Sequence, residues 1–282
     1  MDMRITYTNT RGEMIDFGGP GSVYHYGQNG IRDSLWSYDV SNGIVTFCLG
    51  ERETEFPVHI WAPDETAGIA ARNKLADVCE TDVLAGEPGA LRIGEWSLRC
   101  YVIGSASDAW WYDDRVMAAN LTILAPDPVW TREQAQDYVP ERGGQTSVLG
   151  KDYPHGYPYD YAAQRTVRPY ILDARSPAAC RITVYGPAKS PYVWIGANRY
   201  KVDVDVPAGG LLIIDGRAKT IRLRDIDGNE TDAYTARQRG ARGSGDYVFE
   251  RVAPGYNAVS WDGSFGFEVR AYVERSAPEW TI

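Results

Sequence analysis

Long apolar runs are missing from this sequence of 282 residues, and their absence bounds its class. A helix that crosses a bilayer needs about 20 consecutive apolar residues, and no stretch approaches that length. The first residues, MDMRITYTNTRGEM, also lack the charged-then-apolar pattern of a secretory signal. We therefore expect no membrane insertion, and we expect that the mature protein begins here and stays in water.

Cysteine and histidine are scarce and scattered, which argues against a metal centre. The cysteines form no C-x-x-C pair, and we expect them to be reduced, partly buried side chains. They are Cys48, Cys79, Cys100 and Cys180. No histidine has a second His, Cys or carboxylate at a metal-ligand spacing. These are His25, His59 and His155. We expect no metal and no cofactor, and interpret His59, in an apolar strand, as a structural imidazole.

Signatures of catalysis are absent too. No G-x-S-x-G elbow occurs, and nothing in the sequence pairs two carboxylates for glycoside hydrolysis. The DIDGNE segment at 225–230 resembles a calcium loop, but Gly228 precedes Asn229, which breaks the EF-hand order and favours an Asp-Gly hairpin. No catalytic, cofactor-binding or metal-binding residue is predicted, and we do not expect an enzyme.

Aromatic residues, glycine and proline are abundant and indicate a mostly β protein. The chain has 19 Tyr, 9 Trp, 29 Gly and 16 Pro, which suits short strands joined by tight turns. Its length predicts about two domains. Strand-like runs in the first half lie at 4–8, 14–17, 34–38, 43–49, 56–61, 91–103 and 116–124. An exposed charged link is expected at Glu51–Glu55, and an aromatic hairpin tip at Trp110–Asp114 that either packs under its turn or binds a partner.

One helix is predicted, over Glu65–Glu80, with Asp64 as its N-cap. Its apolar face is expected to consist of Ile69, Leu75, Val78 and Cys79.

Proline, glycine and polar residues dominate from Ala125 to Tyr161, which predicts a domain linker. We therefore expect domains at 1–141 and 142–282. Turn signals every eight to twelve residues in the second domain are typical of a β-sandwich. The strands expected there are 166–172, 180–185, 192–195, 199–206, 210–215, 220–225, 231–234, 247–252, 257–261 and 265–273.

Charge is distributed unevenly along the chain. Residues 1–140 carry 10 Lys and Arg against 21 Asp and Glu, whereas the rest carries 19 against 17. An acidic first half repels phosphate backbones. The one basic cluster, Arg237, Arg239 and Arg242, has no interleaved aromatic residue, which favours a solvated loop over a nucleic-acid site.

The order of these features resembles the distal tail protein family of long-tailed, non-contractile phages. The resemblance rests on the helix AGIAARNKLADVCE, the strands through IGEWSLRCYVIG, the exit VMAANLTILAPDPVW and the entry YPYDYA. At the end of the chain it rests on the turn PGYN at 254–257 and on GFEVRAYVERSAPEW. Nearly the whole chain is covered.

This resemblance implies a ring-forming domain at 1–141, with a split-barrel, tail-tube-like fold and one packed helix, and a galectin-like β-sandwich at 142–282. It implies a structural virion protein: a hexameric ring between the tail tube and the tail-tip or baseplate hub, with the sandwich outward as a docking platform. The implied partners are the tail tube protein and the tail-associated hub protein, with the tape measure or a receptor-binding protein as further candidates. The implied location is the virion tail, assembled in the host cytoplasm.

Two hypotheses concern how such a ring would act. DNA would pass through an acidic lumen without specific binding, and Glu51, Glu53 and Glu55 would face that lumen or a neighbouring subunit.

The alternative function is a carbohydrate-binding module that contacts a cell-wall saccharide. Its platform would be Tyr192, Trp194, Tyr200 and Trp261, side chains that could equally fill a sandwich core.

Overall fold

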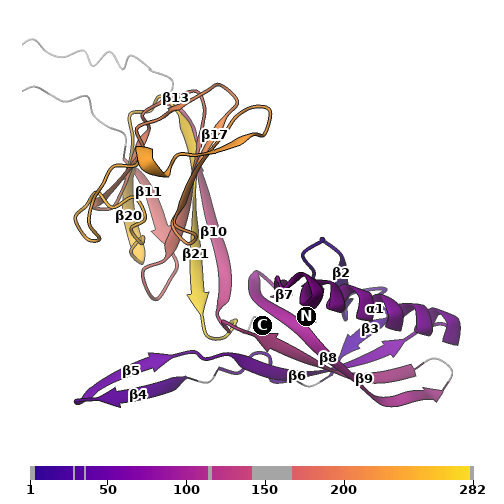
Figure 1. Cartoon of the computed structure of the whole chain (residues 1–282). Coiled ribbons are helices and arrows are strands. Elements are labelled where there is room, and N and C mark those ends of the chain that lie inside the picture. Colours follow the sequence, from indigo (N-terminus) through magenta and orange to yellow (C-terminus); the bar gives the residue numbers. More distant parts are fainter. Residues whose placement is uncertain (1–3, 28, 35, 114–115, 142–166, 280–282) are drawn as a thin grey trace, which may run out of the picture. The chain divides into compact units, whose positions relative to one another are not determined.

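The computed structural model describes residues 4–27, 29–34, 36–113, 116–141 and 167–279, with the side chains of 108–113 excepted. The chain forms two compact units (Figure 1). Unit 1 comprises Met1–Arg132 and Glu274–Ile282, and unit 2 comprises Glu133–Val273. This division differs from the expected one at 141/142 because two strands, β10 (Trp130–Tyr138) and β21 (Gly266–Arg275), each belong mostly to unit 2 but extend into unit 1.

Unit 1 is a β-barrel with one helix. Its strands follow the order β8-β7-β1-β2-β3-β6-β9, and β9 pairs back onto β8, which closes the barrel. Their bounds are β1 (Ile5–Thr8), β2 (Met14–Phe17), β3 (Tyr24–Tyr26), β6 (Arg52–Trp61), β7 (Gly89–Ile93), β8 (Trp96–Asp113) and β9 (Val116–Ala125). All the pairs are antiparallel except β2–β3. Large buried side chains such as Tyr7, Phe17 and Phe56 fill the interior.

The helix α1 (Glu65–Ala85) begins as predicted and ends later. Asp64 Oδ1 accepts a hydrogen bond of 2.8 Å from the Ala67 N–H, which confirms the N-cap. The helix ends at Gly86, whose φ of 67° places it in the left-handed region that favours glycine at a C-cap. Leu75, Val78 and Cys79 are buried as expected, but Ile69 is 49% exposed, so its predicted place on the buried face was wrong.

Two predicted boundaries in unit 1 were also wrong. The run 91–103 is not one strand, because a turn at Gly94 (φ 57°) and Glu95 separates β7 from β8. The acidic stretch at Glu51–Glu55 is not a link, because β6 begins at Arg52 and pairs with β9 along its whole length. The main-chain pairing of β6 therefore continues through the acidic residues.

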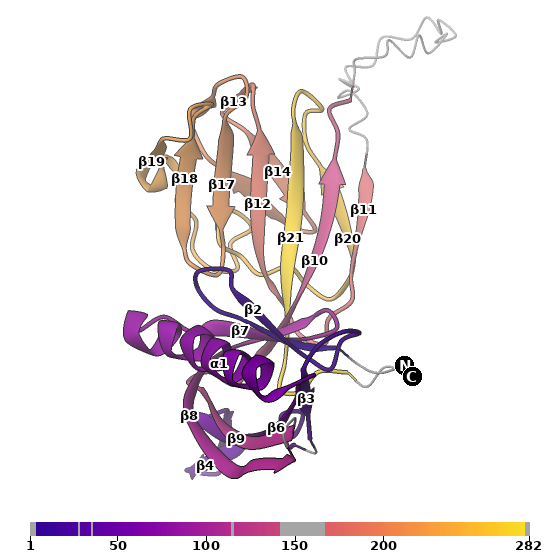
Figure 2. The same ribbon diagram turned by 90° about the vertical axis from the view of Figure 1, so that its right-hand side faces the viewer.

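Unit 2 is built from two main sheets (Figure 2). The larger has the order β19-β18-β17-β12-β21-β10 and the smaller β11-β20-β14-β15. Besides β10 and β21, the bounds are β11 (Arg168–Leu172), β12 (Ala179–Tyr185), β14 (Tyr192–Ile195), β15 (Asn198–Lys201), β17 (Leu211–Asp215), β18 (Thr220–Arg224), β19 (Glu230–Asp232) and β20 (Gly255–Ser260). A small pair, β13 (Ala188–Lys189) and β16 (Asp205–Val206), and a 3₁₀ turn at Tyr234–Ala236 complete it. The mostly β class is confirmed.

Part of the expected linker is a strand instead. In β10, Gln134 Nε2 donates to the Ile171 carbonyl at 2.6 Å, and Gln136 Nε2 donates to the Pro169 carbonyl at 3.1 Å. These amide side chains satisfy backbone groups of β11, so β10 lacks the apolar alternation that identifies a strand. Conversely, the expected strand at 247–252 is a loop with one bridge, at Val252. Residues 142–161 of the expected linker lie outside the described residues.

Among the described residues, no helix is long and apolar enough to cross a membrane.

Candidate assembly surfaces

A two-stranded hairpin is the first candidate surface. β4 (Ser37–Ser41) and β5 (Ile44–Cys48) pair with each other and with no other strand of the described chain. The turn residues Asn42 and Gly43 have φ values of 51° and 79°, the positive pair that a type I′ hairpin turn requires. Strands were expected at 34–38 and 43–49. The Asn-Gly dipeptide was the signal that could have located the hairpin.

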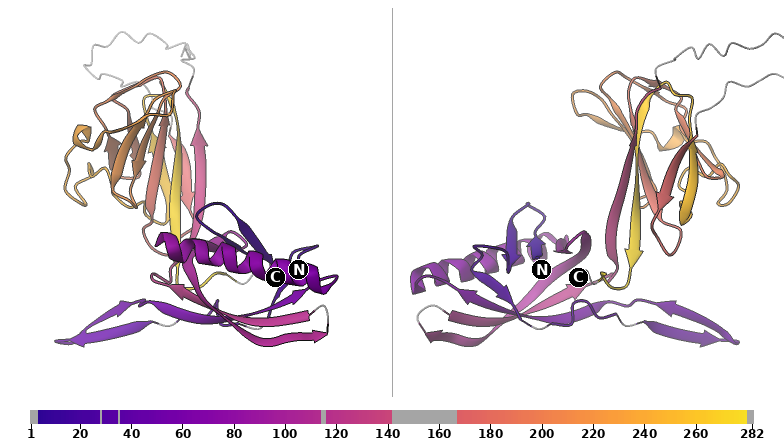
Figure 3. Two further views of the ribbon diagram at one scale, coloured as in Figure 1. Left: turned by 45° about the vertical axis from the view of Figure 1, so that its right-hand side comes forward. Right: turned by 180° about the vertical axis from the view of Figure 1, so that it is seen from behind.

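One face of this hairpin is apolar and uncovered. The register places Tyr38 opposite Phe47 and Val40 opposite Val45 on that face. Their exposed fractions are 71%, 63%, 55% and 49%, respectively. Both views in Figure 3 show the hairpin extending away from the rest of unit 1. An isolated two-stranded hairpin is marginally stable in water, and a contiguous exposed apolar patch marks an interaction site.

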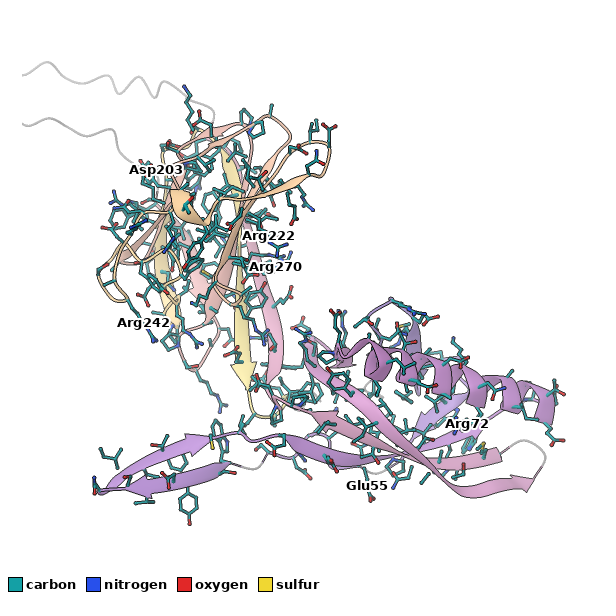
Figure 4. All side chains as sticks on the ribbon, viewed as in Figure 1. Glu55, Arg72, Asp203, Arg222, Arg242 and Arg270 are labelled. Carbon is teal, nitrogen blue, oxygen red and sulfur yellow. The ribbon has the colours of Figure 1, made fainter. Side chains whose placement is uncertain are left out.

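The outer face of β6 is acidic. Glu51, which directly precedes β6, and Glu53 and Glu55 of β6 are all exposed, and the period of two along a strand places Glu53 and Glu55 on one side of the sheet. From Phe56 onward, the alternate residues of the opposite side are buried in the barrel. Asn120 of β9 donates to Glu55 Oε2 at 3.1 Å (Figure 4 labels Glu55). Of the three carboxylates identified from the sequence, two thus lie on one face of β6 and the third lies directly before the strand.

A buried carboxylate fixes α1 to the barrel. Asp82 is fully buried, and its Oδ2 accepts a hydrogen bond of 2.5 Å from the Tyr7 hydroxyl of β1. Its Oδ1 accepts bonds from the backbone N–H and the hydroxyl of Thr10, both at 2.8 Å. Burial, followed by the bond to Asp82, raises the pKa of Tyr7 well above its ordinary value. Sequence reasoning missed this group because an aspartate near the end of a helix is typical of a solvated surface.

Three of the cysteines are buried and one is not. Burial raises the pKa of the Cys79, Cys100 and Cys180 thiols to about 12. Cys48, at the end of β5, is exposed, so the expectation of partial burial was wrong for it. All four are free thiols.

Two of the histidines are neighbours across strands. The register pairs His25 of β3 with His59 of β6, and the His25 ring lies 4.8 Å from the Trp61 ring between centroids. His155 lies outside the described residues. Within the described part of the chain, no group of three or more His, Cys, Asp or Glu could hold a metal ion. The pairing of His25 with His59 was not predicted, because 34 residues separate them in the sequence.

Of the four aromatic rings expected to form a saccharide platform, two are buried and two are half-buried. Tyr200 and Trp261 belong to the core of unit 2, where Trp261 Nε1 donates to the Phe265 carbonyl at 3.0 Å. Tyr192 and Trp194 are half-buried, and the Arg199 guanidinium lies 5.6 Å from the Trp194 ring. The four rings therefore do not form one exposed surface, and no observation favours saccharide binding at this place.

The loop at 225–230 is a hairpin turn. Asp225 Oδ1 accepts from the N–H groups of Asp227 and Asn229 at 2.9 Å, and Oδ2 accepts from Asn229 Nδ2 at the same distance. The bonds from Asn229 lower the pKa of Asp225. Its carboxylate is thus occupied by its own turn, and the Asp-Gly hairpin joins β18 to β19 as predicted.

The three arginines of the 237–242 loop have different surroundings. The Arg237 guanidinium lies 3.7 Å from the Tyr234 ring centre, and its Nη1 donates to the Tyr234 carbonyl at 2.7 Å. Arg239 and Arg242 are exposed.

The strands β8 and β9 form the hairpin that was expected around Trp110 and Trp111, and the side chains of these two residues lie outside the described ones.

No family model matches this sequence, and no curated protein matches it. Solved structures do. The chain is similar to the SPP1 Dit (gp 19.1) protein, described as a paradigm of the hub adsorption apparatus in phages that infect Gram-positive bacteria, with a TM-score of 0.57 over 98% of this chain and 100% of that chain. It is also similar to a chain of the phage P2 baseplate in its activated conformation with Ca, with a TM-score of 0.58 over 99% and 100%.

Sequence identity is 10% in both comparisons, so they bear on the fold. Both cover the whole length of the known chain, and both units of this chain take part in the match. The chain therefore has the fold of the SPP1 Dit protein.

Proposed function

We propose that this chain is a structural protein of a phage tail, a distal connector that forms a ring between the tail tube and the tail-tip or baseplate hub. Support comes from the likeness of fold to a hub protein and a baseplate chain over nearly all 282 residues. The proposed location is the virion tail, after assembly in the host cytoplasm. The proposed role is assembly and not catalysis.

The exposed apolar face of the β4–β5 hairpin is the observation that carries this proposal. Its four apolar side chains have no cover within the described chain, so a folded monomer leaves them in water. Association of identical subunits in a closed ring covers such a surface on every copy at once. We propose a homo-hexamer, with unit 1 as the ring-forming part and unit 2 as an outward docking platform.

The acidic face of β6 suits a channel through which DNA passes. Exposed carboxylates on and directly before β6 repel phosphates, so a lumen lined by Glu51, Glu53 and Glu55 would let the duplex move without binding it. The proposed axial partners are the tail tube protein and the tail-associated hub protein. The tape measure and a receptor-binding protein are further candidates.

The mass of the purified full-length protein tests the proposal. Light scattering with size-exclusion chromatography is expected to give about six times the mass of one chain, with negative-stain images showing a ring. Addition of purified tail tubes is expected to place the ring at one tube end. A stable monomer that neither closes into a ring nor caps a tube would overturn the proposal.

A further inference from the structure

A groove runs between α1 and β8 in unit 1. Its volume is about 280 Å³. Leu75 and Cys79 of the helix and Val102 of the strand form its apolar floor. Val83 and Ile103 lie at the groove with exposed fractions of 44% each. The apolar surface of the barrel interior therefore continues outward to solvent at this place.

The strand beside the groove has an unoccupied edge. β7 pairs with β8 only as far as Cys100, opposite Gly89. Beyond Cys100, β9 continues on the other edge, but no described strand lies on the edge that β7 occupied. A free strand edge presents backbone N–H and C=O groups that can pair with another chain.

A polar group in the groove also lacks a partner among the described residues. Arg72 lines the groove, and its Nε is buried with no hydrogen-bond partner in the part of the chain that the structure describes (Figure 4 labels Arg72, on the side of α1 that faces the strands). A buried N–H without an acceptor is costly, and most such groups in folded proteins are satisfied. The groove thus presents an apolar floor, a strand edge and one N–H that needs an acceptor.

The size of the groove suits an aromatic side chain. A cavity of about 150 Å³ already holds a benzene ring, and the groove is at the lower end of the about 300–1,000 Å³ usual for small-molecule sites. A volume of about 280 Å³ fits one aromatic side chain with part of a neighbour. The occupant expected from the chemistry is a short apolar segment that carries an aromatic ring with a hydrogen-bond acceptor.

The β4–β5 hairpin has these properties. Its apolar face carries Tyr38 beside Val40, the tyrosine hydroxyl can accept a hydrogen bond, and its strands have free edges of their own. Within unit 1 the hairpin extends away from α1, so it does not reach the groove of its own chain (Figures 1 and 3).

We infer that the apolar face of the hairpin of one copy packs in the α1–β8 groove of the next copy, where the Tyr38 ring enters and its hydroxyl accepts a hydrogen bond from Arg72 Nε. This inference rests on the proposed ring and names the contact that closes it. Because the hairpin and the groove are different surfaces, the contact is heterologous, and repetition around an axis gives a ring.

Filling the groove tests the contact without removing any buried group. Ala76 lines the groove and is half-buried, so Ala76→Phe occupies the space meant for the neighbour's hairpin. Asn73→Phe is the matched control, because Asn73 is exposed on the same helix and does not line the groove. Light scattering over a dilution series is expected to show that Ala76→Phe raises the concentration for half assembly by roughly tenfold or more, as for the loss of a central contact.

Tyr38 provides a second, independent readout. Tyr38→Phe keeps the ring but removes the acceptor for Arg72, so it is expected to weaken assembly less than Tyr38→Ala, which removes both. In a background of Arg72→Met, which has no N–H to satisfy, the difference between Tyr38 and Tyr38→Phe is expected to disappear. A difference that persists unchanged in that background would overturn the assigned hydrogen bond.

Cross-linking distinguishes this contact from the ring itself. In a Cys48→Ser background, a Val40→Cys chain is mixed with an Ala76→Cys chain and treated with a short bismaleimide, with Val40→Cys and Asn73→Cys as the control pair. A covalent dimer specific to the first pair supports the inference. If the wild type forms rings but Ala76→Phe assembles normally and the dimer is no more abundant than in the control, the hairpin contact is wrong and the ring proposal stands. A monomeric wild type overturns both.

Discussion

The Tyr7 hydroxyl lies 2.5 Å from Asp82 Oδ2, and this contact joins the first strand of the barrel to the last turns of the helix, 75 residues away. Thr10 supplies two further donors to the same carboxylate. The backbone of Gly89 also lies close to this carboxylate, because a Cβ at Gly89 would come within 2.3 Å of Asp82 Oδ2. The helix end, β1 and the start of β7 thus meet around one buried carboxylate.

Replacement of Asp82 by alanine is expected to destabilise unit 1 by about 2–4 kcal/mol, because it leaves the Tyr7 hydroxyl and the Thr10 N–H without their acceptor. The matched control is Asp77→Ala on the exposed side of the same helix, which is expected to change stability by less than about 0.5 kcal/mol. Urea unfolding of the two variants provides the measurement. Equal losses would show that the carboxylate network does not hold the helix.

The raised pKa of the buried thiols predicts that stability falls in alkali. Cys79 and Cys100 titrate at about 12 in the folded chain, against 9.0 for an ordinary thiol. Between these values the unfolded chain has lost protons that the folded chain keeps, so folding stability is full below pH 9 and decreases as the pH rises. Each thiol is expected to contribute a slope of about 1.4 kcal/mol per pH unit in that window.

Cys100→Ala separates this titration from packing. The variant is expected to be less stable than the wild type at pH 7, because it leaves a small cavity, but to lose stability less steeply between pH 9 and 12. The measurement is the free energy of unfolding in urea at several pH values. Parallel curves for the variant and the wild type would contradict the assignment.

Thiol reactivity is expected to separate the four cysteines. Cys48 is exposed, whereas Cys79, Cys100 and Cys180 are buried. A maleimide at neutral pH is therefore expected to modify Cys48 in the monomer and to reach the other three only in denaturant. Peptide mass spectrometry identifies the sites, and Cys48→Ser is the control expected to remain unlabelled when folded.

The helix and the barrel strands could be predicted where burial follows a simple period. Asp64 marks the helix start, and Leu75, Val78 and Cys79 repeat at helical spacing. The end of the helix was missed because Asp82 interrupts the apolar period while being buried itself. A polar residue satisfied by distant partners cannot be identified from spacing, since its partners come from another strand.

The strand β10 was missed for the same reason. Gln134 and Gln136 bind the backbone of β11, so amide groups occupy positions where a strand pattern requires apolar side chains.

The assembly surfaces were identified only in part. The acidic residues Glu51, Glu53 and Glu55 were identified from the sequence, although their strand was not. The apolar hairpin was not identified, because Phe47 was assigned to an ordinary strand and Val40 fell between the two expected strands. Only the folded register shows that no described part of the chain covers these side chains.

The turn of the hairpin should affect assembly and leave the fold intact. Gly43 has a φ of 79°, which a β-branched residue rarely adopts, so Gly43→Val is expected to distort the hairpin. Because the hairpin pairs with no other strand of the described chain, the midpoint of urea unfolding of dilute, monomeric protein is expected to stay unchanged while assembly weakens. The paired measurements are urea unfolding of dilute protein and light scattering over a concentration series. Thr46→Val is the control, because Thr46 lies opposite Asp39 on the other face of the hairpin, outside the four turn residues 41–44.

Reversal of the acidic face should convert a surface that repels DNA into one that retains it. Glu51→Lys, Glu53→Lys and Glu55→Lys together change the charge of each subunit by six, at the start of β6, where all three side chains are exposed. Each new phosphate contact releases counterions, so retention of duplex DNA by the triple variant is expected to be strong at low salt and to fall steeply as salt rises. The control reverses Asp77, Glu87 and Glu95, which are exposed elsewhere on unit 1, and it changes the charge of each subunit by the same amount.

If the β6 face lines the channel, the β6 variant retains DNA more strongly than the control, since six copies surround the duplex. Equal retention by both variants would show that net charge alone is responsible, and unchanged DNA retention together with unchanged ring formation would place the β6 face neither in the channel nor against a neighbour.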